Sequence, residues 1–87
     1  MLKEVPGRLA AYLLYLSDEK SGETSIDLNI SKGQLASLLG TIPETLSRIF
    51  ARMTQRGLIE VDGRHIKITD HSGLEALARG EKPLAGP

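Results

Sequence analysis

Glu44, Ser47 and Arg48 stand close together in a segment whose apolar residues repeat with helical spacing. On a helix, Glu44 and Arg48 lie one turn apart on the same face, and Ser47 lies beside them. An arginine can donate two hydrogen bonds to guanine O6 and N7, and a glutamate can accept one from cytosine N4. These side chains are therefore candidates for reading base pairs in a major groove. The alternative is a surface ion pair between Glu44 and Arg48, which is common at this helical spacing.

The stretch 31–40 predicts the first of two short helices that would position these side chains. Ser31 and Gln34 have the spacing of a capping box, in which each side chain bonds the backbone N–H of the other residue. Gly40 marks the end of this helix, because glycine takes a left-handed conformation at little steric cost. The apolar residues between these signals have the spacing of one buried face: Leu35, Leu38 and Leu39.

A second helix is expected directly after Gly40. Thr41 and Glu44 have the spacing of another capping box, and Pro43 falls in the first turn, where its missing N–H is harmless. The predicted buried stripe of this helix is Leu46, Ile49, Phe50 and Met53. The predicted exposed face is Glu44, Arg48, Ala51 and Gln55, flanked by Ser47 on one side and by Thr45 and Arg52 on the other. Two compact helices joined by a turn containing glycine are typical of a helix-turn-helix.

The remaining segments predict a small sheet and two further helices. Residues 6–17 read as a helix, since proline is favoured in a first turn. Residues 25–30 alternate polar and apolar side chains, which predicts a short half-buried strand. The runs 58–61 and 65–69 surround an Asp-Gly-Arg turn and predict a β-hairpin.

A short C-terminal helix is expected through Leu74, Leu77 and Ala78, with Asp70 or Ser72 as its cap. The predicted fold is thus mainly α with a small β-hairpin wing: a winged helix-turn-helix with a three-helix core plus the short C-terminal helix. Residues 1–80 are predicted to form one domain. Residues 81–87 contain two prolines and a glycine and are predicted to be a flexible tail.

Residues 40–49 (GTIPETLSRI) resemble the recognition-helix motif of the Crp/Fnr superfamily of bacterial transcription regulators. Residues 5–10 resemble the entry into that family's DNA-binding domain, and residues 57–59 and 62–66 resemble its wing. The resemblance covers nearly all of residues 5–69 and implies a winged-helix domain that binds duplex DNA. It also implies the residues that contact bases, which are Glu44, Ser47 and Arg48.

The Glu-x-x-Ser-Arg form of this motif is similar to the Fnr branch of the family, whose DNA half-sites are of the TTGAT type. The cyclic-AMP receptor branch has a glycine where this chain has Ser47. Pro43 also departs from that second branch, which has a basic residue before the glutamate.

Contacts to the DNA backbone are expected at the helix starts and at the wing. Helix N-termini attract anions, so the backbone and side chains at Ser31 and Lys32 suit a phosphate. The resemblance places Lys32, Gly33, Thr45 and the wing tip at backbone-contacting positions. Such contacts orient a protein on DNA without reading its sequence. The complete set of candidates is Ser31, Lys32, Gly33, Thr45, Arg52, Gly63 and Arg64.

The composition argues against catalysis and against metal binding. The absence of cysteine excludes disulfides, thiolate metal sites and a cysteine nucleophile. His65, Asp70 and His71 lack a helical ligand pair, and no glycine-rich phosphate loop follows a strand. We therefore expect no enzymatic activity, no metal and no cofactor in this domain.

The charge balance keeps a second function open. Eleven basic residues balance eleven acidic ones, whereas domains that bind DNA by general electrostatics are clearly basic. Within residues 31–56, however, four basic residues face one acidic residue. Double-stranded DNA is therefore the expected partner, and the alternative is a winged-helix protein–protein interaction module that does not bind DNA.

The expected cellular context follows from segments that the chain lacks. No apolar run approaches the roughly 20 residues that span a bilayer, and no signal peptide begins the chain, so a cytoplasmic protein without membrane association is expected. Crp/Fnr regulators carry a sensor domain and a dimerisation helix that 87 residues cannot hold. We therefore expect a domain of a longer, homodimeric regulator. The acidic loop from Asp18 to Glu23 is interpreted as a solvated turn, with contact to RNA polymerase as the lesser hypothesis.

Overall fold

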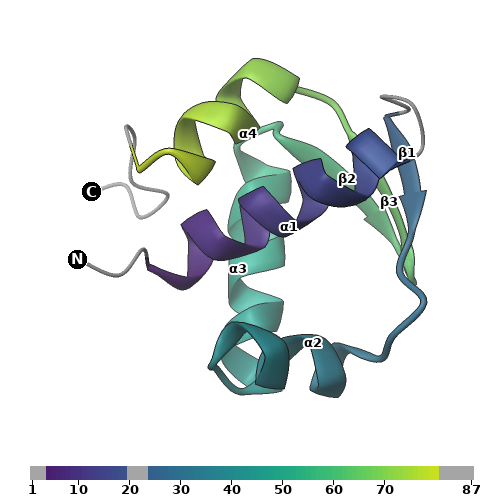
Figure 1. Cartoon of the computed structure of the whole chain (residues 1–87), viewed down its shortest axis with the longest axis vertical. Coiled ribbons are helices and arrows are strands. Elements are labelled where there is room, and N and C mark those ends of the chain that lie inside the picture. The colour runs from purple at the N-terminus through teal and green to yellow at the C-terminus, as the bar shows by residue number, and fades with distance from the viewer. Residues whose placement is uncertain (1–3, 20–23, 81–87) are drawn as a thin grey trace.

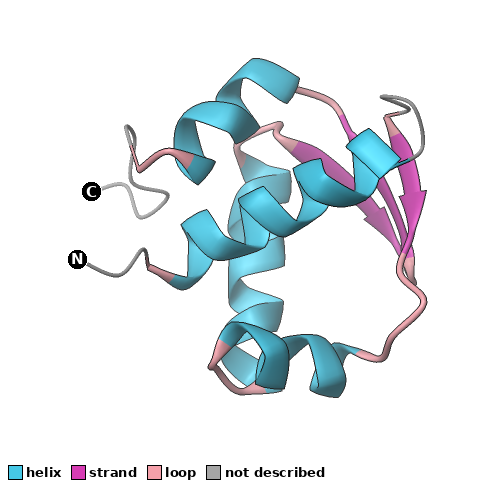
Figure 2. Cartoon of the chain, viewed as in Figure 1, coloured by secondary structure: helices cyan, strands magenta, loops and turns pink. Residues whose placement is uncertain are grey.

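The computed structural model describes residues 4–19 and 24–80. These residues form four helices and a three-stranded antiparallel sheet. Figure 2 shows the sheet at one edge of the molecule and the helices beside it. This arrangement confirms the predicted mainly α fold with a β wing. The elements are, in order, α1 (Val5–Glu19), β1 (Ser25–Asp27), α2 (Lys32–Leu39), α3 (Pro43–Gln55), β2 (Ile59–Asp62), β3 (His65–Ile68) and α4 (His71–Ala78).

Helix α3 stands at the centre of the fold, and α1 crosses it with α2 below and α4 above in the view of Figure 1. The four residues predicted as the buried stripe of α3 are all buried: Leu46, Ile49, Phe50 and Met53. They pack in one core with Leu9 and Leu13 of α1. Burying one face of α3 leaves the opposite face to solvent, where the candidate base-reading residues lie.

Helix α4 lies alongside α1 and contributes to the same core (Figure 1). Its Leu74 is fully buried. Of the two predicted caps, Asp70 is the N-cap, and its carboxylate accepts a hydrogen bond of 3.0 Å from the Gly73 N–H. The short C-terminal helix is therefore an integral layer of the domain.

The sheet has the strand order β1-β3-β2. Strands β2 and β3 form the predicted hairpin, and Asp62 pairs with His65 across a two-residue turn at Gly63 and Arg64. The strand predicted over residues 25–30 ends earlier, at Asp27. The reason is geometric: Asp27 already pairs with His65, the first residue of β3, so beyond it lies the hairpin turn rather than a strand.

The acidic loop predicted from Asp18 to Glu23 lies partly outside the described residues. Helix α1 continues through Glu19, and residues 20–23 are not described. The tail at residues 81–87 also lies outside them. No helix within the described ranges has the length and apolarity needed to cross a membrane.

Candidate nucleic-acid interface

The start of α2 forms the complete capping box that the sequence predicts. The Ser31 hydroxyl accepts a hydrogen bond of 3.1 Å from the Gln34 N–H, and the Ser31 N–H donates one of 3.0 Å to Gln34 Oε1. At the other end of α2, Gly40 adopts the predicted left-handed conformation with φ of 75°. The Thr41 N–H then bonds the Ala36 carbonyl at 2.8 Å, which closes the turn into α3.

The predicted capping box at Thr41 and Glu44 is wrong. The N-cap of α3 is Ile42, at φ of −111° and ψ of 157°, and its side chain makes no capping bond. Pro43 causes this shift, because a residue before proline is held extended and proline itself suits the first helical position. The helix therefore begins one residue later than the capping box requires, and the Glu44 carboxylate accepts a hydrogen bond from Arg48 instead.

The three predicted base-reading residues lie together on the exposed face of α3. Glu44 Oε2 and Arg48 Nη2 are 3.3 Å apart, and both side chains are 73% exposed. The predicted alternative, an ion pair, is therefore present in the unbound domain. Such an exposed ion pair stabilises a helix by only about 0.2–0.5 kcal/mol. Each side chain can therefore leave its partner and bind a base instead. Ser47 is exposed beside them.

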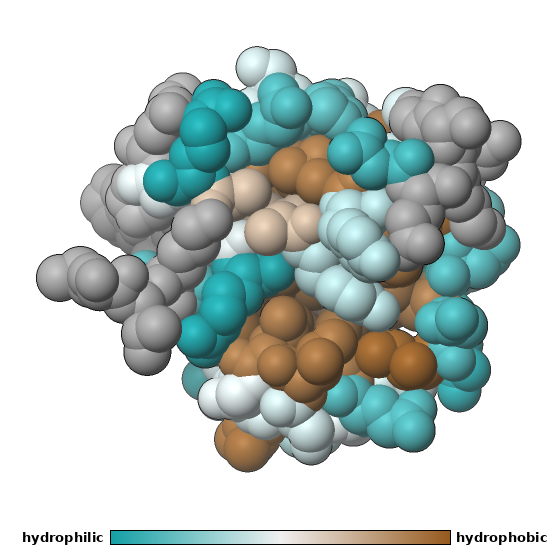
Figure 3. Space-filling model, viewed as in Figure 1, coloured by the Kyte–Doolittle hydropathy of each residue, from teal (hydrophilic) through white to brown (hydrophobic). Residues whose placement is uncertain are grey.

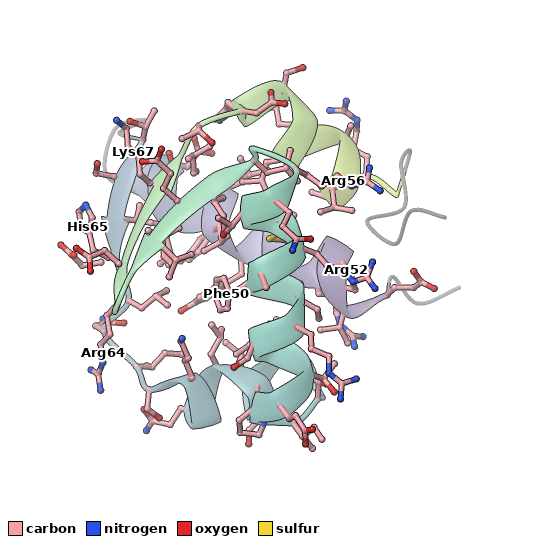
Figure 4. All side chains as sticks on the ribbon, turned by 180° about the vertical axis from the view of Figure 1, so that it is seen from behind. Phe50, Arg52, Arg56, Arg64, His65 and Lys67 are labelled. Carbon is pink, nitrogen blue, oxygen red and sulfur yellow. The ribbon has the colours of Figure 1, made fainter. Side chains whose placement is uncertain are left out.

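The wing tip presents Arg64 to solvent on the hairpin turn. Gly63 takes φ of 60°, a conformation that glycine adopts without strain. The Leu28 N–H donates a 2.8 Å hydrogen bond to the Arg64 carbonyl, and His65 Nδ1 lies 2.8 Å from Asp27 Oδ1. These contacts anchor the tip to β1. Figure 4 shows the Arg64 side chain pointing away from the sheet.

The start of α2 offers both backbone N–H groups and a lysine side chain as candidate phosphate contacts. The backbone N–H of Ser31 is used inside the capping box, so the outward-facing donors there are the backbone N–H groups of Lys32 and Gly33. The Lys32 ammonium lies 5.7 Å from the centre of the Phe50 ring, a distance at which a cation is attracted to an aromatic face. This contact places the Lys32 charge next to α3.

An open cavity of about 580 Å³ lies between the start of α1 and α3. It brings Thr45 and Arg52, which are predicted to contact the DNA backbone, together with Arg48, which is predicted to read a base. Arg8 of α1 also lines it, and the sequence did not identify this residue as functional. A signal was present, since Arg8 is the single basic residue within α1. The complete lining is Glu4, Val5, Pro6, Arg8, Thr45, Arg48, Ile49 and Arg52.

Basic side chains therefore flank the exposed face of α3 on both sides. In Figure 4 the Arg64 side chain lies on the wing side of α3, and the Arg52 side chain lies on the opposite side. A helix with hydrogen-bonding groups along its exposed face and cations to either side is suited to a groove between two phosphate backbones. The net charge of the chain is zero, but its basic residues are thus concentrated around α3.

Residues 7–77 match a family model described as a Crp-like helix-turn-helix domain. The chain belongs to the Crp/Fnr family. The transcriptional activator protein FnrA of Stutzerimonas stutzeri is 37% identical over 82 residues, which are 90% of this chain and 34% of that protein. The electron transport regulator A of Shewanella oneidensis is 35% identical over 80 residues, covering 87% and 32% of the two chains.

Solved structures of the Crp/Fnr family share the fold. The crystal structure of DNR from Pseudomonas aeruginosa superposes with a TM-score of 0.76 at 36% identity, covering 84% of this chain and 33% of that one. FixK2 from Bradyrhizobium japonicum gives a TM-score of 0.78 at 25% identity, covering 86% and 38%. The chain spans about a third of the length of the curated relatives it matches.

These findings confirm three of the expectations from the sequence. The resemblance to the Crp/Fnr family is correct, and the winged helix-turn-helix is the fold of the family. The matched model is that of a helix-turn-helix domain and the relatives are named as transcription regulators, in agreement with the expectation of a regulatory rather than a catalytic domain. The roles of individual residues in contacting DNA remain predictions.

Proposed function

We propose that this domain binds double-stranded DNA sequence-specifically in bacterial transcription regulation, with α3 inserted in the major groove. The observation that carries the proposal is the exposed row of Glu44, Ser47 and Arg48 on a helix whose other face is fully buried. Membership of the Crp/Fnr family supports it, as does the similarity to a protein named as a transcriptional activator.

The base-reading roles follow from the chemistry of the three side chains. Arg48 donates to guanine O6 and N7, and Glu44 accepts from cytosine N4. A half-site of the TTGAT type holds one G·C pair, which offers both of these groups. The ion pair between Glu44 and Arg48 holds the two side chains next to each other before DNA arrives.

The phosphate contacts fall into three groups around α3. Gly63 and Arg64 approach one backbone from the wing, while Thr45 and Arg52 approach from the side of the α1–α3 cavity. The start of α2 supplies the third group, which is Ser31, Lys32 and Gly33. Because each neutralised phosphate releases counterions, the affinity falls steeply with added salt.

The proposed partners belong to a longer protein. A homodimer of the whole regulator would place two copies of α3 on half-sites one helical turn apart. RNA polymerase is proposed as a second partner through the acidic segment from Asp18 to Glu23. The proposed site of action is the cytoplasm, and no cofactor is proposed for this domain.

DNA binding at low salt tests the proposal directly. The probes are a duplex with two inverted TTGAT-type half-sites and a scrambled duplex of equal length. We expect a preference for the first duplex, and we expect Arg48→Ala to reduce this preference by about tenfold or more through loss of a base contact. Arg56→Ala is the matched control, because Arg56 is an exposed arginine at the C-terminal end of α3. Equal affinity of the wild-type domain for both duplexes would contradict the sequence-specific function.

One observation favours a second candidate function, a protein–protein interaction module. Among the described residues, three large apolar side chains are exposed: Tyr15 at 59%, Leu38 at 62% and Ile42 at 57%. The prediction that Leu38 belongs to the buried face of α2 is therefore wrong, and only Leu35 and Leu39 of that predicted face are buried. Figure 3 shows apolar residues gathered over the region between the ribbons of α1 and α2. No binding to either duplex at low salt would favour this candidate. A partner bound equally well by the wild-type and Arg48→Ala domains would support it.

A further inference from the structure

Arg8 connects α1 to the turn of the helix-turn-helix. Its Nη2 donates a 2.9 Å hydrogen bond to the Leu39 carbonyl, which lies 31 residues further along the chain. The bond is partly buried. Leu39 is the last residue of α2, so the guanidinium also lies at a helix C-terminus, where a cation is favourable. A single side chain thus satisfies one of the carbonyl groups that a helix end leaves without an intrahelical partner.

The turn itself satisfies the neighbouring carbonyls. The Gly40 N–H bonds the Ser37 carbonyl at 3.1 Å, and the Thr41 N–H bonds the Ala36 carbonyl at 2.8 Å. The carbonyl of Leu39 is the one that reaches out of the turn, to α1. Arg8 Nη2 also lies 3.7 Å from where a Cβ on Gly40 would stand, so the guanidinium packs directly against the left-handed residue.

Beyond this turn, α3 has no side-chain cap to hold its first residues. Its N-cap is Ile42, which makes no capping hydrogen bond. Apart from the core packing of its buried stripe, the start of α3 is therefore held by the turn and by whatever braces that turn. Arg8 provides that brace from a third helix.

One donor of the Arg8 guanidinium carries an energetic cost. Its Nε is buried and has no hydrogen-bond partner among the described residues. A buried donor without a partner is destabilising, so an apolar residue would be expected here unless the guanidinium served a purpose. Arg8 also lines the cavity shared with Arg48 and Arg52, which places it beside the base-reading face.

We propose that Arg8 is a positioning residue for DNA recognition. It fixes the α2–α3 turn against α1, and so sets the angle at which Glu44, Ser47 and Arg48 meet the bases. This inference rests on the proposed DNA-binding function and extends it to a residue that is not on the recognition helix.

The ratio of affinities for the half-site and scrambled duplexes separates positioning from a simple phosphate contact. Loss of a phosphate contact weakens binding to both duplexes about equally and leaves the ratio unchanged. Misplacement of the base-reading side chains lowers the ratio, because base contacts carry the discrimination. The experiment therefore measures both affinities for each variant at one salt concentration.

Three variants complete the design. Arg8→Met removes every donor but keeps an unbranched apolar stem, and Arg8→Lys keeps one donor for the Leu39 carbonyl. Leu77→Val is the control for stability, because Leu77 is buried in α4 rather than at the turn. The carbonyl ¹³C shift of Leu39 and the amide ¹⁵N shift of Gly40 report in each variant whether the hydrogen bond persists.

We expect Arg8→Met to lower the ratio about tenfold, Arg8→Lys to recover most of it, and Leu77→Val to leave it unchanged. A folded Arg8→Met domain with the wild-type ratio would overturn the inference and leave the DNA-binding function standing. If Arg8→Met does not fold, the Arg8→Lys variant decides between the outcomes. If it keeps the wild-type Leu39 carbonyl shift but loses the preference for the half-site duplex, the inference is overturned. If it keeps both the shift and the preference, the inference is supported.

A wild-type domain that shows no preference between the duplexes would instead contradict the proposed function. The positioning role is then decided by the amide spectra of the Arg8 variants without DNA. Shifts that spread to Glu44, Ser47 and Arg48 support it. Shifts confined to α1 and Leu39 overturn it.

Discussion

The two helices of the helix-turn-helix begin in opposite ways. Helix α2 starts with a capping box in which Ser31 and Gln34 satisfy each other's backbone N–H groups. Helix α3 starts with Ile42, an apolar N-cap that is 57% exposed and makes no capping bond. Serine, threonine, aspartate and asparagine are the preferred N-caps, and lacking one costs a helix about 0.5–2 kcal/mol.

The capped start of α2 therefore stabilises the fold, whereas the start of α3 has no side-chain cap. Pro43 and Glu44 offset part of the missing cap, since proline has no N–H to satisfy and an acid in the first turn interacts favourably with the helix dipole. Pro43 and Glu44 are exposed and Thr45 is half-buried, on the helix proposed to enter the major groove. We infer that stability is forgone at the helix start where DNA is expected to bind.

The largest expected effect concerns the glycine that lies between the two helix starts. Gly40→Ala should reduce the free energy of unfolding by about 1–2 kcal/mol, because the left-handed conformation strains any residue with a Cβ. The space is adequate, since the nearest atom to that Cβ is Arg8 Nη2 at 3.7 Å. Urea unfolding of the domain measures the change.

Gly33→Ala is the matched control for Gly40→Ala. Gly33 is the second residue of α2, and its added Cβ would meet Ser31 Oγ at 3.8 Å, an ordinary contact. We expect it to increase the free energy of unfolding by about 0.4–1 kcal/mol, since alanine is the better helix former. Equal losses for both variants would contradict the assignment of the strain to the backbone of Gly40.

The next largest effect concerns the capped start of α2. Ser31→Ala should lower the free energy of unfolding by about 1 kcal/mol, because it leaves the Gln34 N–H without its acceptor. Ser37→Ala, at an exposed position within α2, should change it by less than about 0.5 kcal/mol. Thermal unfolding compares the two, and a Ser31 variant as stable as the Ser37 variant would show that the capping box contributes nothing.

The smallest effect concerns the uncapped start of α3, where the free energy of unfolding is expected to rise rather than fall. Ile42→Ser should raise the free energy of unfolding by about 0.5–1 kcal/mol, because serine can cap the helix where isoleucine does not. Ile42→Ala removes the same apolar surface without adding a cap and should give no gain. If both substitutions destabilise the domain equally, Ile42 contributes packing that outweighs a cap.

Local sequence signals predicted most of the elements correctly. Ser31, Gly40 and Asp70 act where their residue types indicate, because a cap or a left-handed glycine depends on neighbours within four residues. The error at Thr41 has the same local origin: two signals competed for one helix start, and the proline prevailed over the capping box. The buried stripe of α3 was also predictable from its period.

Contacts between distant segments were not predictable from those signals. The pairing of β1 with β3, the Arg8 bond to Leu39 and the cavity between α1 and α3 all join residues that the fold alone brings together. The sequence placed Thr45, Arg48 and Arg52 around one helix, but it did not indicate that Arg8 would stand beside them.

The anchoring of the wing to β1 has a consequence for how the domain folds. Strand β1 precedes the helix-turn-helix and its partner β3 follows it, so the sheet closes a loop that contains both α2 and α3. Closing such a loop costs chain entropy before the pairing repays it, and folding slows as contacting residues become more distant in sequence. We expect the helices to order first and the wing to be completed last. The wing, which we propose to contact the DNA backbone, would then join α3 in the final step of folding.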